Sequence, residues 1–160
     1  MNQENRTNII AELVELIEKG NAHVSFEDAV ADLPSESRTV TPENLPYSIW
    51  QLVEHMRITQ KDILVFSTSE NYKPIKWPDD YWTENKKTVS DAEWNNSLKE
   101  IKKDRDSFFE LLKNDKNDLF DRFEWGDGQS LLREALLIAD HNSYHTAEIV
   151  VIRRFLKCWN

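Results

Sequence analysis

The chain has 160 residues, a formal net charge of −9 and a single cysteine. That length suits one domain, 1–160, with a core large enough to fold without covalent staples. The acidic excess opposes binding to nucleic acid and to anionic membranes, since both carry negative charge themselves. Three glycines and five prolines in the whole chain favour long helices over many short strands with tight turns.

The start of the chain, MNQENRTNIIAEL, lacks the basic residues and the apolar run of a secretory signal. No apolar stretch approaches the ~20 residues that cross a bilayer. The lone cysteine, Cys158, has no partner for an internal disulfide. We therefore expect a cytoplasmic protein that binds neither membranes nor nucleic acid.

Apolar residues at helical spacing predict a first helix over residues 5–19 and a shorter helical piece within 22–33. A polar stretch with three prolines follows, and it cannot be a continuous helix. Ser48 and Gln51 then have the spacing of a capping box. The sequence therefore predicts that a long helix begins after Ser48 and continues to about Phe66.

Residues 69–88 form a long predicted loop with two prolines and four aromatic residues. Long loops in compact domains are often functional. We expect Trp77, Tyr81 or Trp82 to pack across the bundle. Two roles remain open for these rings, which would either cover the mouth of a metal site or only cap the core.

Two further helices complete the pattern. Ser90 and Glu93 form a second capping box, and the helix that they start should continue through Leu112. The last helix is expected from near Ser130 to about Lys157, a length of roughly 40 Å. Four main helices with connections of unequal length predict an all-α four-helix bundle.

The last predicted helix carries a histidine pair. His141 and His145 are four residues apart, so both rings project from one face. That face continues as an apolar stripe, and the rings should therefore point into the bundle. Buried imidazoles need polar partners, and a metal ion satisfies two at once. The pair alone is weak evidence, because each ring could equally hydrogen-bond to a neighbouring group.

His55, on the apolar face of the helix after Ser48, is the natural third ligand. Three neutral imidazoles leave coordination positions open, as in catalytic zinc sites, although the same set also suits nickel or iron. Glu148 follows His145 by one helical turn. It could be a ligand, an acceptor for an imidazole N–H or a surface carboxylate.

Three other residues of suitable chemistry are expected outside this cluster. Asp62 is two turns along from His55 on the same face; it could reach the cavity, but we expect a charge that faces solvent. His23 has no partner at ligand spacing and is interpreted as structural or exposed. Cys158 has no neighbouring base in the sequence that would make it a nucleophile.

The segments SIWQLVEHMRITQKDIL at 48–64 and HNSYHTAEIVVIRR at 141–154 resemble the DinB-like (damage-inducible) metalloprotein superfamily. The aromatic segment WPDDYW at 77–82 is also similar to members of that group. The resemblance extends over nearly the whole chain. It implies an up-up-down-down four-helix bundle with a divalent metal ion near one end of the core.

By this resemblance, His55 from the second helix and His141 and His145 from the fourth are the metal ligands. Many relatives carry Gln where this chain has Glu148. The superfamily includes bacillithiol S-transferases and mycothiol-dependent maleylpyruvate isomerases. The resemblance therefore implies a low-molecular-weight thiol and a small electrophilic substrate, with the metal favouring thiolate over thiol. It also implies a homodimer.

Fold and metal do not settle the reaction class. The alternative function is that of a metal-binding or stress-associated interaction protein without turnover. No residue in the sequence selects a particular thiol or electrophile, so no catalytic residue is assigned. An open coordination position beside a formed pocket would favour the enzyme, and a site sealed by side chains would favour the alternative.

Overall fold

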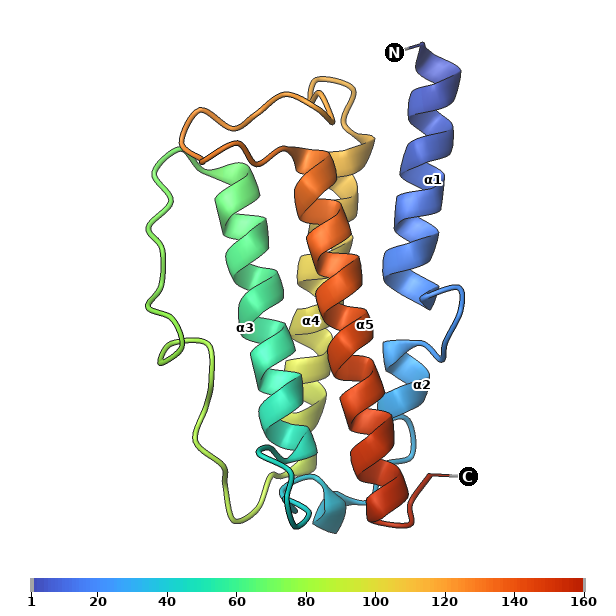
Figure 1. Cartoon of the computed structure of the whole chain (residues 1–160), viewed down its shortest axis with the longest axis vertical. Helices are drawn as coiled ribbons and strands as arrows, with labels where there is room; N and C mark the ends of the chain where they lie inside the picture. Colours follow the sequence, from blue (N-terminus) through green and yellow to red (C-terminus); the bar gives the residue numbers. More distant parts are fainter. Residues whose placement is uncertain (1, 160) are drawn as a thin grey trace.

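The computed structural model describes residues 2–159. Its helices are α1 (Gln3–Lys19), α2 (Phe26–Val30), α3 (Ile49–Thr68), α4 (Asp91–Lys113) and α5 (Leu131–Phe155). Helices α1 and α2 follow each other along one side of a bundle whose other members are α3, α4 and α5 (Figure 1). The described residues contain no named strand, and the predicted all-α four-helix bundle is confirmed. None of these helices is both long and apolar enough to cross a membrane.

The helix directions differ from the expected up-up-down-down order, because α3 and α4 are parallel. Glu54 Oε1 accepts a hydrogen bond from Ser97, and further along both helices Gln60 donates one to the carbonyl of Ile101. The length of segment 69–90 makes this direction possible, because the segment can extend up to roughly 70 Å, twice the roughly 35 Å length of α4. It runs back along the outside of α3 before α4 begins, so the order of directions is down-up-up-down (Figure 1).

The beginnings of the two central helices follow the sequence prediction. Ser48 and Gln51 form a complete capping box before α3, and Ser90 and Glu93 form another before α4. Helix α1 ends at Gly20, whose φ of 70° is the left-handed conformation that glycine adopts without strain. The helical piece expected within 22–33 is shorter than its pattern, and only α2 is helical.

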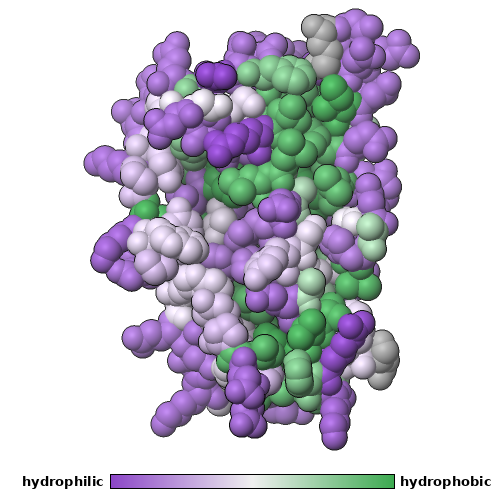
Figure 2. Space-filling model, in the orientation of Figure 1, coloured by the Kyte–Doolittle hydropathy of each residue, from purple (hydrophilic) through white to green (hydrophobic). Residues whose placement is uncertain are grey.

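The apolar core is divided into two clusters, one toward each end of the bundle. One joins α2 to the first half of α3 and the second half of α5, and the other joins α1 to the opposite ends of α3 and α5. Between them lie buried polar side chains, among them His55, Gln60, Asp104 and His145. Figure 2 shows a similar division on one face, with apolar areas over both ends of α5 and more polar atoms between. Buried polar groups need partners, so this layer is where a site is to be sought.

Replacing Ser90 with Ala should lower the free energy of unfolding by about 1 kcal/mol, because its Oγ accepts the Glu93 N–H at the start of α4. Urea unfolding followed by circular dichroism measures the change. Ser107→Ala is the matched control within the same helix, where Ser107 donates to the Lys103 carbonyl. Alanine favours the helix interior, so that variant should lose nothing. Equal losses in both variants would contradict the role of the cap.

Candidate metal centre

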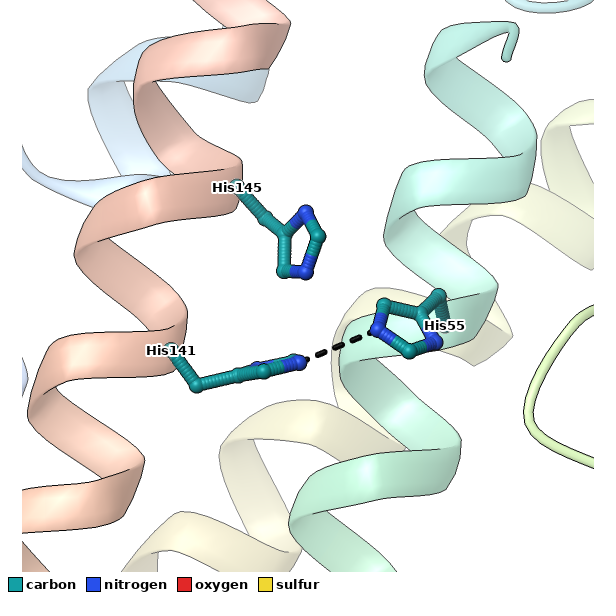
Figure 3. Close-up of side chains that lie close together, drawn as sticks. All are labelled: His55, His141 and His145. Carbon is teal, nitrogen blue, oxygen red and sulfur yellow. Dashed lines mark hydrogen bonds between the residues drawn. The ribbon is translucent and has the colours of Figure 1, made fainter. Parts of the chain in front are cut away.

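Three histidines meet between α3 and α5. His55 projects from α3, and His141 and His145 project toward it from successive turns of α5 (Figure 3). Their candidate ligand nitrogens all lie within 4.8 Å of one another. Within residues 2–159 this is the only group of three or more His, Cys, Asp or Glu side chains close enough to hold one ion. His55 is 2% exposed and His145 is 6% exposed, so the cluster belongs to the buried polar layer.

Hydrogen bonds at the outer nitrogens fix how two of these rings are oriented. His55 Nδ1 lies 2.9 Å from the carbonyl oxygen of Tyr81, and His145 Nδ1 lies 2.7 Å from Glu148 Oε2. Because both partners can only accept, the two Nδ1 atoms carry the protons. The Nε2 lone pairs of His55 and His145 are then left facing the cluster. Of the three roles open for Glu148, the structure shows the hydrogen-bond acceptor.

His141 completes the group through its own Nε2, which lies 3.0 Å from Nε2 of His55. Since His55 Nε2 carries no proton in this tautomer, His141 donates that hydrogen bond. Two imidazole nitrogens bound to one ion at about 2.0–2.1 Å lie about 3.0–3.4 Å apart for ordinary coordination angles. The spacing therefore fits a shared ion once the His141 proton moves to Nδ1.

Burial keeps these rings neutral. Burial, together with a smaller effect of the neighbouring histidines, lowers the pKa of His141 to about 3 and that of His145 to about 4. The pKa of His55 is also lowered, again chiefly by burial. Neutral imidazole is the form that binds metal ions. The cluster is thus in the ligating protonation state at neutral pH without any proton having to leave.

The segment between α3 and α4 forms one wall of the cluster. The Trp82 ring stacks on His55 with centroids 3.9 Å apart, and Tyr47 stacks on the opposite face of Trp82 at 3.8 Å. Trp82 also packs against the apolar core and so caps it, as one of the two expected roles requires. Trp77, in contrast, is 66% exposed and meets His55 only at its edge.

Two cavities lie beside the cluster. An apolar cavity of about 270 Å³ is lined in part by Tyr144 and Glu148, and the Tyr144 ring also meets His145 edge-on at 5.0 Å. A more polar cavity of about 430 Å³ is lined in part by Tyr81, whose carbonyl binds His55. The histidines themselves line neither cavity, but residues in direct contact with them line both.

Asp62 lies outside the histidine cluster, but the prediction that it faces solvent is wrong. It is half-buried and accepts hydrogen bonds from the hydroxyl groups of Tyr72 and Tyr81. Its seven-residue spacing from His55 indicated an inward position. The two tyrosines that bind it could not be predicted, because they come from a segment without a periodic pattern. His23 is exposed and pairs with Ser143, as expected.

A family model described as the DinB superfamily matches residues 22–149, which include the three histidines and Glu148. The chain belongs to the DinB superfamily. No curated protein and no solved structure matches it. The resemblance found in the sequence is thereby confirmed at the level of the superfamily.

The histidine cluster of this DinB-superfamily protein should make the metal-free fold sensitive to acid. Because the pKa values of His141 and His145 are lowered to about 3 and about 4, the unfolded chain binds more protons than the folded one below its own pKa of about 6.5. Stability is therefore complete above pH 6.5 and falls as the pH drops toward 4.

Each of these two histidines should lower the free energy of unfolding by about 1.4 kcal/mol per pH unit below 6.5. Urea unfolding of chelator-treated protein at pH 7.5 and pH 5.5 measures the loss. A variant with Asn at both positions lacks these two titrating groups, so its free energy of unfolding should fall less between the two pH values. All other titrating groups are unchanged, so the difference from wild type reports the two histidines. An identical loss in wild type and variant would contradict this account.

Proposed function

We propose that this protein binds one divalent metal ion through the Nε2 atoms of His55, His141 and His145. The observation that carries the proposal is the inward direction of neutral imidazole nitrogens whose outer nitrogens are already engaged by Tyr81 and Glu148. Such partners orient metal-bound histidines and raise their basicity. Without an ion, the cluster would hold three imidazoles around one shared hydrogen bond.

Zinc, nickel and iron all suit an imidazole set, so the ligands do not select among them. Three protein ligands leave at least one coordination position for water or a substrate atom. That count is typical of catalytic rather than structural zinc sites.

We further propose that the site activates a low-molecular-weight thiol, whose sulfur loses its proton and bonds to the carbon of a small electrophile as the electrophile's leaving group departs. Support comes from the superfamily and from the apolar cavity against Glu148, which would suit the carbon skeleton of a substrate. A divalent ion would supply stabilisation of thiolate over thiol. Glu148, whose pKa is raised by burial, is placed to accept the proton that the thiol loses.

A non-catalytic metal-binding protein is the second candidate, and a specific observation favours it. Trp82 covers one face of His55, and none of the three histidines lines either of the two cavities beside the cluster. A metal ion enclosed in this way would serve binding or stability rather than turnover. The two candidates differ in whether a thiol can reach the metal ion.

The homodimer remains a prediction. Exposed apolar side chains along α5 would provide a face for a second copy, since contiguous apolar patches often mark interfaces. They are Leu136, Leu137, Tyr144, Val151 and Phe155.

Replacing His145 with Ala should remove most of the bound metal, because the remaining two imidazoles form an incomplete site. Wild-type protein, purified without chelator and supplied with zinc, nickel or iron, should carry close to one ion per chain. Elemental analysis and metal titration measure both. His23→Ala is the control, since His23 is exposed and outside the cluster. Equal metal content in wild type and His145→Ala would defeat the assignment.

Cobalt-loaded protein distinguishes the two candidate functions. Adding 2-mercaptoethanol should produce a sulfur-to-cobalt charge-transfer absorption in the near ultraviolet if a thiol reaches the metal and binds as thiolate. Ethylene glycol, which has no sulfur, is the matched control, and His145→Ala should give no band. Stoichiometric cobalt without this absorption would reject the thiol enzyme and favour the non-catalytic protein.

A further inference from the structure

The larger cavity, between α3, α5 and the two long connections, is lined by polar groups that have no partner. Its volume is about 430 Å³, within the range of small-molecule sites. Glu134 on α5 lines it, and its side chain is 5% exposed. Among the described residues, no hydrogen-bond donor reaches the Glu134 carboxylate, and Arg133 Nη1 is 4.0 Å away, beyond hydrogen-bonding distance. A buried carboxylate in this state is costly.

Two further oxygen atoms, on residues that line the same cavity, lack partners. Thr59 Oγ1 and Gln129 Oε1 are both buried without a hydrogen bond to any described residue. An amide oxygen and a carboxylate can only accept, and a hydroxyl can accept as well as donate. These acceptors receive no hydrogen bond from the described residues, so a ligand that fits the cavity should supply N–H or O–H groups.

Asp62 adds a second negative charge to the cavity wall. It accepts from Tyr81 Oη at 2.6 Å and from Tyr72 Oη at 3.0 Å, which fixes the carboxylate in place. Burial and this contact raise the pKa of Tyr72 to about 12, so the phenol stays protonated and Asp62 stays the acceptor. A carboxylate with about four acceptor positions retains capacity for another donor.

A metal ion is a poor occupant here. Among the described residues, no group of three or more potential ligands close enough to share one ion lies in this cavity, and the volume of the cavity far exceeds that of a bare ion. Ile63, Phe66, Leu137 and the ring of Trp125 contribute apolar surface to the same walls. Fixed acceptors beside apolar and aromatic surface match a positively charged donor on a carbon skeleton.

We propose that this cavity binds the ammonium group of a small organic primary amine, with Glu134 and Asp62 as its acceptors. An ammonium carries three donors, of which Glu134 and Asp62 would accept two. Asp62 follows His55 by two helical turns, and Glu134 precedes His141 by two, which places the amine site roughly 10 Å along the bundle from the histidines. The site is therefore separate from the proposed metal centre and does not depend on it.

Arg133 is the one cation at the cavity wall that competes for Glu134. Its side chain is 60% exposed, so water screens its charge, and an ion pair of this kind contributes little to stability. A compact ammonium inside the cavity would lie closer to the carboxylate. Arg133→Ala should therefore leave amine binding unchanged or tighter, and should not reduce stability.

The test uses 2-phenylethylamine, n-pentylamine and cyclohexylmethylamine as probes, with 2-phenylethanol as the neutral isostere of the first. Titration of the protein as purified, followed by calorimetry and by the Trp125 indole resonance in NMR, should show saturable binding of an amine and none of the alcohol. Glu134→Gln keeps the shape but removes the charge, and it should weaken amine binding at least about tenfold, since hydrogen bonds to charged groups are the strong ones.

Two control variants show whether amine binding depends on this cavity alone. Glu110→Gln, on the exposed side of α4, should bind amine like wild type and excludes general attraction to an acidic surface. His145→Ala should also bind normally, which excludes coordination of the amine to a metal ion. Glu134→Gln should be at least as thermally stable as wild type, because it removes a buried charge without hydrogen bonds. The proposal is overturned if no probe amine saturates, if the alcohol binds equally, or if Glu134→Gln binds like wild type.

Discussion

The antiparallel contact between α3 and α5 determines what the interior of this protein can do. In an antiparallel pair, moving forward along one helix corresponds to moving backward along the other. His55 faces His141. Asp62 lies seven residues after His55, Glu134 lies seven residues before His141, and both line the same cavity. Because seven residues are close to two full turns, both pairs lie on the same inner faces. One register thus creates a nitrogen-lined and an oxygen-lined level in a single interface.

The two apolar clusters make such a polar layer tolerable. Large buried side chains fill the core on both sides of it, including Leu52 and Met56 in one cluster and Phe108 and Leu112 in the other. Burial of such side chains is worth roughly 2 kcal/mol each, whereas a buried polar group without a partner costs about as much. The polar layer therefore lowers stability locally, while the apolar clusters at both ends hold the bundle together. Ligands that supply the missing hydrogen-bond partners would offset that loss of stability.

Periodic patterns predicted much of this arrangement. The capping boxes at Ser48 and Ser90 fixed two helix starts, and the four-residue spacing of His141 and His145 fixed a shared face. A periodic pattern states which face of a helix is buried but not which neighbour covers it or in which direction. The parallel course of α3 and α4 followed from a crossover segment, 69–90, that is long enough for either direction, and so it could not be deduced from helical patterns.

The same segment explains why the surroundings of the site were harder to predict than its histidines. It has no regular structure, so its position depends on individual polar and aromatic contacts rather than on a repeated face. Tyr81 makes two of them, since its carbonyl accepts from His55 while its hydroxyl donates to Asp62. Trp82, the next residue, stacks on the His55 ring. The backbone of Tyr81 therefore binds the histidine level of the α3–α5 interface, and its side chain binds the carboxylate level. In this way the irregular crossover forms one wall of both levels.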